Sequence, residues 1–468
     1  MGTILVTGAT GYIGGRLVPE LLARGYDVRV MVRETFPDQK ERWPNAQIVV
    51  ADALDPSSLR EALDGVHSAY YLIHSLPLGQ KKFEFSNIQA AINFGHASAK
   101  ENVKRIIYLE GLGDTQMYAS VPTELKREQV DTTVLRATSI FGSGSASFEL
   151  LTHLVANLRI LFAPYWARSE CQAISVRDVI KYLVGVLETP ATHGKTFDIG
   201  GRDLLTYATM LRTIAAPLDR KILIVPFPIS WIRAYSYLAN LITPVPGPII
   251  TCLLDRIENR AICQNDDITR LVPFETLSFK ETLLAAIQSD EQDNVQTRWS
   301  DAYPRDYHLQ DKLHEMEAAP FYTASASLLS SKTESSLFQS ICMIGGDEGW
   351  FNSDWMWRLR GIMDRVLLGV GTLRGRRSAT KLRVNDVIDF WRVEDLEDDR
   401  RLLLRAEMKL PGWAWLEFRI EGEDDKNRLS VNAYYEPKGL AGKLYWYIFL
   451  PFHSFIFKDL IKQIEKRG

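Results

Sequence analysis

Residues 7–14 read Thr7-Gly8-Ala9-Thr10-Gly11-Tyr12-Ile13-Gly14 and lie between two recognisable patterns. The apolar run Ile4–Val6 before them predicts a short buried strand. The segment Gly14–Arg24 after them places its leucines and Val18 on one face, which predicts a helix. A glycine-rich turn therefore joins the first strand to the first helix.

Each glycine of this turn has a physical reason to be there. Gly8 permits a tight turn, Gly11 lets the backbone approach a pyrophosphate, and Gly14 lets the helix pack closely on the strand. The free N–H groups at the positive end of a helix then bind the pyrophosphate. The alternative, a glycine-rich turn without a ligand, is disfavoured by the flanking strand and helix. The sequence therefore predicts a dinucleotide site whose loop contacts are Gly8, Thr10, Gly11, Tyr12, Ile13 and Gly14.

Strand and helix patterns alternate through the first half of the chain. Continuous apolar strands separated by helices predict a parallel sheet covered on both faces, with right-handed crossovers. The fold class is α/β, a doubly wound Rossmann domain. The strands are expected at Val28–Val32, Gln47–Val50, Ala69–Ile73, Arg105–Leu109, Thr133–Arg136 and Thr196–Ile199, with a long helix from Phe85 to Glu101 and a last one at Ser278–Ile287.

The residues that follow the next strands extend the predicted site. Arg33 ends the second strand, where a guanidinium suits the 2′-phosphate of NADP and a carboxylate would suit NAD. We therefore expect NADP rather than NAD, against the alternative of a solvated surface arginine. Asp52, beside Ala53, follows the third strand and is expected near the adenine amino group, unless it is a turn or N-cap residue.

The end of the fourth strand contributes two more expected cofactor contacts, Ile73 and His74. Ligands bind at the carboxyl edge of such sheets, so His74 is expected to reach the nicotinamide ribose. A structural histidine is the alternative.

These motifs resemble those of the short-chain dehydrogenase/reductase superfamily. Residues 7–14 are similar to its TGxxGxxG loop, Val30–Arg33 to the second-strand ending of atypical NADP-binding members, and Phe197–Gly201 to a late segment of extended members. The resemblance covers residues 1–290. Within the superfamily, the chain is most similar to atypical members related to an accessory subunit of mitochondrial complex I.

The chemistry that this resemblance implies lacks its usual residues. The family uses a Tyr-x-x-x-Lys pair preceded by a serine or threonine, and the lysine lowers the pKa of the tyrosine. No hydroxyl residue occurs in Leu109–Gly113, Tyr118 is followed four positions later by Pro122, and the Tyr434…Lys438 spacing is attributed to chance. The catalytic residues are therefore unknown. The candidates near the expected cleft are Tyr118, Lys126, Glu110 and His74, each with an ordinary structural role as its alternative.

The last third of the chain has a different character. The segment Thr323–Ser336 is small and polar and predicts a linker, and the runs after it predict strands at Asp386–Val393, Arg401–Lys409, Trp413–Glu421 and Arg428–Glu436. With an aromatic-rich helix expected at Leu444–Glu465, this region resembles the helix-grip, START-related family. That resemblance implies an α+β domain with an apolar cavity. The alternative is a domain without such a cavity, in which the aromatic side chains fill the core. His453 is expected to be packed rather than functional. The expected division is a Rossmann domain over 1–300, a linker over 301–336 and a helix-grip domain over 337–468.

Composition excludes several partners. The 468 residues carry 55 Lys+Arg against 58 Asp+Glu, so a nucleic-acid surface is not expected. Four scattered cysteines give no metal site or disulfide scaffold and fit a cytoplasmic protein. Prolines and Arg233 interrupt the apolar region Ile222–Leu254, which predicts a pair of helices over a substrate cleft rather than a membrane span. Attachment to a membrane surface is left open, and the sequence gives no oligomeric state.

Two functions follow from these patterns. The first is an NADP(H)-dependent oxidoreductase that acts on a hydrophobic small molecule. The second is a non-catalytic NAD(P)H-binding sensor, scaffold or assembly factor, which the missing catalytic set favours.

Overall fold

The computed structural model describes residues 2–35, 37–73, 80–112, 120–163, 165–227, 232–258, 262–291, 295–302, 313, 320, 322–346, 348–423 and 425–468. The chain divides into two compact units. Unit 1 comprises Met1–Ala239 and Gly247–Pro304, and unit 2 comprises Asn240–Pro246 and Arg305–Gly468.

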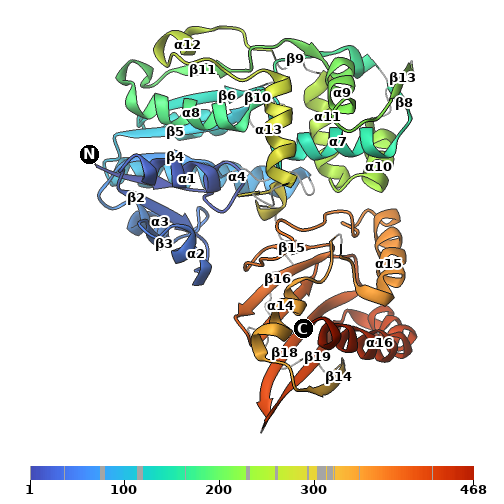
Figure 1. Ribbon diagram of the computed structural model, residues 1–468. Helices are drawn as coiled ribbons and strands as arrows, with labels where there is room; N and C mark the ends of the chain where they lie inside the picture. Colours follow the sequence, from blue (N-terminus) through green and yellow to red (C-terminus); the bar gives the residue numbers. More distant parts are fainter. Residues whose placement is uncertain are drawn as a thin grey trace. The chain divides into compact units, whose positions relative to one another are not determined.

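Unit 1 is built on a seven-stranded sheet in the order β11-β6-β5-β4-β1-β2-β3 (Figure 1). Every neighbouring pair in this sheet is parallel, which confirms the predicted parallel Rossmann-like sheet. The strands are β1 (Thr3–Val6), β2 (Val28–Val32), β3 (Gln47–Val50), β4 (Val66–Tyr71), β5 (Arg105–Gly111), β6 (Asp131–Ala137) and β11 (Thr196–Ile199).

Helices cover both faces of this sheet, because alternate side chains of each strand point to opposite sides. Ile4 and Val6 of β1 belong to a core shared with α1 (Gly14–Ala23) and α8 (Val176–Glu188). Leu5 belongs to a second core on the other face, shared with α3 (Pro56–Leu63), α4 (Gln80–Lys100) and α6 (Val121–Lys126). The short strand therefore supplies both hydrophobic cores.

The rest of unit 1 is a mixture of short elements. The apolar region 222–254 contains β13 (Leu223–Pro226), α10 (Ile232–Ile242) and α11 (Gly247–Glu258), so it does hold a pair of helices. No helix in the described part of the chain is long and apolar enough to cross a membrane. Further elements of the described residues are α2 (Pro37–Arg42), β7 (Ile140–Phe141), α7 (Ala146–Asn157), β8 (Ile160–Ala163), β9 (Glu170–Cys171), β10 (Ile174–Ser175), β12 (Leu205–Thr206), α9 (Tyr207–Ala215), α12 (Asp267–Leu271), α13 (Phe279–Glu291) and the 3-10 turns Tyr165–Arg168, Pro190–Thr192 and Trp299–Ala302.

Unit 2 contains a six-stranded antiparallel sheet in the order β14-β19-β18-β17-β16-β15. The strands are β14 (Tyr322–Ser330), β15 (Val387–Ile388), β16 (Trp391–Glu397), β17 (Arg401–Ala406), β18 (Gly412–Glu423) and β19 (Lys426–Pro437). The helices are α14 (Glu334–Cys342), α15 (Asp354–Val366) and the long α16 (Gly439–Arg467), and α16 packs on β14, β19 and α14.

Two expectations for this region are wrong. The predicted linker contains β14, which pairs with β19 along its whole length from Tyr322↔Tyr435 to Ser330↔Asn427. Its small polar residues have weak strand propensity, and the long-range pairing decides the structure. The predicted strand Asp386–Val393 is interrupted at Asp389, whose φ of 55° turns the chain between β15 and β16.

Candidate nucleotide site

Four parallel strands of unit 1 bring the predicted cofactor residues to one edge of the sheet. β1 lies between β4 and β2, and β3 follows β2. The residues after their carboxyl ends are Gly8, Arg33, Asp52 and Ile73. The crossover direction reverses on either side of β1, which is where open parallel sheets form their ligand crevice.

The glycines of the loop after β1 are required by its backbone. Gly8 has a φ of 61°, and a Cβ there would lie 2.6 Å from the carbonyl oxygen of Leu72. A Cβ on Gly14 would lie 2.4 Å from the carbonyl oxygen of Gly8. The amide of Gly11 donates to the carbonyl of Gly8 at 3.0 Å and closes the turn. The loop therefore excludes side chains at Gly8 and Gly14, as the sequence predicted.

The helix that follows this loop begins without a side-chain cap. Ile13 occupies the N-cap position and makes no side-chain hydrogen bond to α1, whose first turn has no acidic residue. The amides of Gly15 and Arg16 donate to the carbonyls of Gly11 and Ile13 at 3.0 Å, and the helix dipole favours an anion in front of them. Thr10 is exposed, and Gly11, Tyr12 and Ile13 are partly exposed, so the predicted contacts line an accessible helix start.

Residues from the far end of unit 1 brace the loop. The hydroxyl of Thr297 donates to the carbonyl of Tyr12 at 2.8 Å. The Arg16 guanidinium donates to the carbonyls of Ser143 (2.8 Å) and Thr297 (3.2 Å), and lies 4.8 Å from the centre of the Tyr12 ring. No local sequence pattern signals these contacts, because the residues that make them are more than a hundred positions apart.

A second arginine accompanies Arg33 near the helix start. Arg33 is exposed directly after β2. Arg42, the last residue of α2, packs against the α1 backbone, since a Cβ on Gly15 would lie 2.3 Å from its Nη2. Its guanidinium is 4.8 Å from the ring of Trp43, which is buried. The sequence analysis did not predict a role for Arg42, although a second basic residue soon after β2 could have indicated one.

The remaining expected cofactor contacts have structural surroundings of their own. The carboxylate of Asp52 accepts the amide of Leu54 at 2.9 Å, as a turn aspartate does. Ala53 is buried and its carbonyl accepts from Asn93 at 3.1 Å. Ile73 is partly buried against the α3–α4 core, and His74 lies outside the described residues. Their contacts with a nucleotide stay predictions.

The catalytic candidates are not brought together among the described residues. Tyr118 and His74 lie outside them. Glu110 pairs in register with Arg136 on β6, and the Arg136 guanidinium binds Asp198 on β11 at 2.7 Å. Lys126 is exposed at the end of the six-residue helix α6. Glu110 and Arg136 therefore belong to a row of charged residues across the sheet edge.

Two thiols near the same strand ends, the buried Cys171 and the partly buried Cys263, are unreactive. Burial, reinforced by the charge of Asp198, raises the pKa of Cys263 to about 12. Burial also raises the pKa of Cys171. Both groups are therefore protonated at neutral pH and poor nucleophiles. Among the described residues, no cluster of His, Cys, Asp and Glu could hold a metal ion.

In unit 2 the aromatic residues of α16 divide between core and surface. Trp446 stacks on Tyr435 of β19 with ring centres 5.6 Å apart, and His453 stacks on Phe457 at 5.4 Å. Burial lowers the pKa of His453 to about 4, which agrees with the expected packed histidine. These side chains fill the space between the sheet and the helix.

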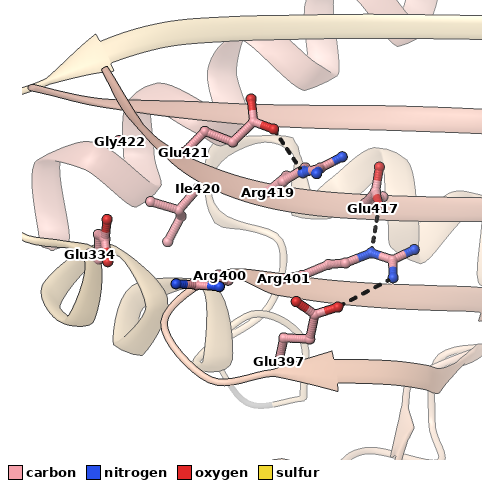
Figure 2. Close-up of a pocket in the computed structure, with 9 residues that line it drawn as sticks. All are labelled: Glu334, Glu397, Arg400, Arg401, Glu417, Arg419, Ile420, Glu421 and Gly422. Carbon is pink, nitrogen blue, oxygen red and sulfur yellow. Dashed lines mark hydrogen bonds and ion pairs between the residues drawn. The ribbon is translucent and has the colours of Figure 1, made fainter. Parts of the chain in front are cut away.

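A groove of about 560 Å³ at the sheet of unit 2 is charged rather than apolar. Figure 2 shows Arg401 between Glu417 and Glu397, with Arg419 turned toward Glu421. Arg401 contacts Glu417 at 2.6 Å and Glu397 at 3.7 Å, and Arg419 contacts Glu421 at 3.0 Å. Its lining carries four glutamates and three arginines, so this groove does not fit the expected hydrophobic ligand.

The parallel sheet, the glycine loop and the uncapped helix define the class of Rossmann-type nucleotide-site proteins. Residues 1–126 match the model of the NmrA-like family, and residues 317–460 match that of a family described as protein of unknown function DUF2867. Each match covers less than a third of the chain, so the N-terminal region is similar to the NmrA-like family and the C-terminal region to DUF2867.

Two curated relatives each match part of the chain. Photosystem II assembly factor Ycf39 of Trieres chinensis is 22% identical over 209 residues, which are 43% of this chain and 64% of that protein. Cinnamoyl-CoA reductase 1 of Oryza sativa subsp. japonica is 28% identical over 121 residues, which are 24% of this chain and 36% of that protein. The chain therefore spans less than two thirds of the length of these relatives.

Two solved structures share the fold of unit 1. A nucleoside-diphosphate-sugar epimerase from Staphylococcus aureus has a TM-score of 0.50 at 17% identity and covers 60% of this chain and 99% of its own. The Citrobacter sp. triphenylmethane reductase complexed with NADP(H) has a TM-score of 0.50 at 18% identity, with the same coverage. At these identities the likeness concerns the fold.

Proposed function

We propose that unit 1 binds NADP(H) at the carboxyl edge of β1–β4. The observation that carries this proposal is the start of α1, which has no side-chain cap and follows a loop that admits no Cβ at Gly8 or Gly14. Such a helix start satisfies its N–H groups with phosphate oxygens. The match to the NmrA-like model and the NADP(H)-bound triphenylmethane reductase support the choice of nucleotide.

Preference for the 2′-phosphate rests on two guanidinium groups. Arg33 follows β2, where the adenine ribose lies in Rossmann sites, and Arg42 packs beside Gly15. A guanidinium gives charge-assisted hydrogen bonds to a phosphate dianion and no comparable gain with a 2′-hydroxyl. We therefore infer that NADP(H) binds more tightly than NAD(H).

Calorimetry with NADPH and NADH on the full chain tests this assignment. We expect Arg33→Ala to weaken NADPH about tenfold and NADH hardly at all, and Arg42→Ala to weaken both, since its guanidinium also lies beside the phosphate-binding helix start. Arg60→Ala removes the same charge from an exposed position on α3 and should change neither affinity. Binding of neither nucleotide to the wild type contradicts the proposal, and equal loss of both in Arg33→Ala contradicts the role of Arg33.

The first use that we propose for the nucleotide is oxidoreductase chemistry on a hydrophobic small molecule. The apolar helices α10 and α11, together with reductases among the matched relatives, support it. A second use, as a non-catalytic scaffold or assembly factor, is supported by the missing Ser and Tyr-x-x-x-Lys set and by the assembly-factor relative.

Nucleotide turnover separates these two uses. NADPH absorbance is followed with hydrophobic quinones and aldehydes, using a Gly14→Ala variant as the nucleotide-free control. Oxidation of NADPH by the wild type alone supports the enzyme. Tight NADPH binding with no oxidation across the panel supports the scaffold.

For unit 2 we propose a helix-grip architecture. Its element order is one strand, two helices, five strands and a long helix, and the first strand β14 lies beside the last strand β19. The packing of α16 on β14 and β19 supports the same assignment. Native mass spectrometry of the purified full chain tests whether this unit retains a hydrophobic molecule.

A further inference from the structure

The exposed face of α15 is apolar. Trp355, Leu359, Ile362, Met363 and Val366 are all exposed, and their helical spacing places them on one side of the helix. The opposite side carries the buried residues Gly361, Asp364 and Arg365. Surface helices of globular proteins normally direct the apolar stripe inward. α15 does the reverse, so its outward face needs a partner other than its own unit's core.

The N-terminal half of α16 has the same property. Its C-terminal half buries Ile456, Phe457, Leu460, Ile461 and Ile464. The half before it buries Gly442 and Trp446 and exposes a series of apolar residues. That series comprises Leu440 (84% exposed), Leu444, Tyr447, Ile448, Phe452 and Phe455 (66% exposed).

The loop between β17 and β18 holds these two surfaces at one end of unit 2. Arg360 of α15 donates to the carbonyl of Lys409 at 2.9 Å, and the amide of Lys409 donates to Asp364 at 2.6 Å. Two residues further, the carbonyl of Pro411 accepts the amide of Lys438 at 2.8 Å, directly before α16. Figure 1 shows α15 and α16 on the same flank of this unit. We call their combined apolar surface the α15–α16 face.

The charges around the α15–α16 face are mostly positive, and Asp354 at the start of α15 is paired with Arg358. Lys409, Lys438 and Lys443 are exposed, and residues 437–458 contain no acidic side chain. Between residues 355 and 384 the single acidic residue is Asp364, which is buried and accepts the amides of Lys409 and Gly371. The face therefore combines aromatic and aliphatic side chains with a rim of exposed lysines.

We propose that the α15–α16 face lies on the surface of a lipid bilayer that contains anionic phospholipids. An interfacial helix buries an apolar face in the headgroup region and uses lysines to contact anionic lipids, while tryptophan and tyrosine favour the same depth. Trp355, Tyr447 and the lysines match that distribution. The C-terminal half of α16 packs on the sheet of unit 2, so only the exposed side of its N-terminal half is free to meet the bilayer. The helix therefore lies along the membrane surface and does not cross the membrane. This proposal concerns unit 2 and does not depend on nucleotide binding by unit 1.

Vesicle flotation with the full chain provides the test. We expect the protein to float with vesicles of phosphatidylcholine and phosphatidylglycerol and to bind phosphatidylcholine vesicles much more weakly, with a loss in high salt. Leu359→Glu should lower the vesicle-bound fraction about tenfold, because an exposed leucine that inserts into the headgroup region is replaced by an anion. Replacement of Lys438 and Lys443 by glutamine should lower binding about fivefold for each charge removed.

The matched control is Leu329→Glu. Leu329 and Leu359 are both 51% exposed, but Leu329 alternates with Leu328 along β14 and points away from α16. It should leave vesicle binding unchanged. Equal losses in the two variants, or no binding to anionic vesicles by the wild type, overturn the proposal. A dimer in light scattering that Leu359→Glu dissociates, without vesicle binding, overturns it in favour of a second copy of the chain.

Discussion

The nucleotide site of unit 1 and the charged interior of unit 2 handle polar groups in opposite ways. At the loop after β1 the polar groups are backbone amides at an accessible helix start, and the side chains are absent. In unit 2 they are side chains enclosed in the fold. Glu407 is buried between Arg374, at 2.8 Å, and Arg392. The first arrangement presents the positive end of a helix to a ligand, whereas the second pairs buried charges with one another and stabilises one packing.

The pKa of Glu407 reflects two opposing effects, the burial of its carboxyl group and the charges of its two arginine partners. Burial alone raises the pKa of this carboxyl, but the charges and hydrogen bonds of Arg392 and Arg374 outweigh burial and hold the pKa far below its ordinary value. The carboxylate is therefore the form that the fold requires. Breaking such a buried set by removing one partner leaves uncompensated charge.

The largest effect that we expect is on this set. Glu407→Gln leaves Arg374 and Arg392 buried without their anion, so the free energy of unfolding of unit 2 should fall by about 3–5 kcal/mol. Denaturant titration followed by tryptophan fluorescence measures it. The control Glu423→Gln disrupts the exposed pair with Arg428 and should have no measurable effect. Equal stability of the two variants would remove the contrast between the two units.

The same contrast explains what the sequence could predict. The loop around Gly8–Gly14 is specified by local residues and by strand and helix patterns on either side, so its position and glycine requirements were predictable. The brace from Thr297 and the packing of Arg42 on Gly15 depend on residues far from the loop in sequence or on the packing of α2, and no local pattern encodes them.

Unit 2 contains both elements that local sequence patterns predict and elements that they do not predict. Its long strands β18 and β19 were predicted because they alternate in polarity over many residues. β14 was mistaken for a linker, because its Ser and Ala residues give no strong strand signal and nine pairs with β19 decide its conformation. The break at Asp389 was missed since it depends on one left-handed residue, held by Trp350, whose indole donates to the carboxylate at 2.7 Å.

A second prediction concerns the glycine loop Gly8–Gly14 after β1. In Gly14→Ala the new Cβ would meet the carbonyl oxygen of Gly8 at 2.4 Å and displace the loop. NADPH affinity, measured by calorimetry, should fall about 100-fold, because the helix N–H groups no longer converge on the phosphates. Gly25→Ala is the control, since Gly25 ends α1 with open space around it. It should cost about 1 kcal/mol of stability through its positive φ and leave affinity unchanged.

A third prediction uses pH to sharpen the account of unit 2. Burial lowers the pKa of His453 to about 4, below its ordinary value near 6.5. The folded state therefore binds fewer protons than the unfolded state between these two values. The stabilisation is complete above pH 6.5 and is lost as the pH falls toward 4.

His453→Phe should remove this part of the pH dependence. Between pH 7 and pH 5, the unfolding free energy of the wild type should fall by about 2 kcal/mol more than that of the variant. The variant ring can keep the tilted contact with Trp446 and the stacking on Phe457. The exposed His96, changed to phenylalanine, should leave the slope for unit 2 as it is. Parallel pH profiles for wild type and His453→Phe would contradict the buried neutral imidazole.

The smallest expected effect tests whether the loop after β1 keeps its geometry through its own residues alone. Thr297→Val keeps the shape of the side chain but removes the hydrogen bond to the carbonyl of Tyr12. We expect a loss of about 1 kcal/mol in stability and a threefold to fivefold loss, as an order of magnitude, in NADPH affinity. Thr282→Val removes a comparable hydrogen bond to the carbonyl of Ser278 in α13 and should lose similar stability with no change in affinity. If both variants bind NADPH like the wild type, the loop holds its geometry through its own backbone. A selective loss in Thr297→Val means that the site of unit 1, like the interior of unit 2, depends on a side chain that local sequence does not reveal.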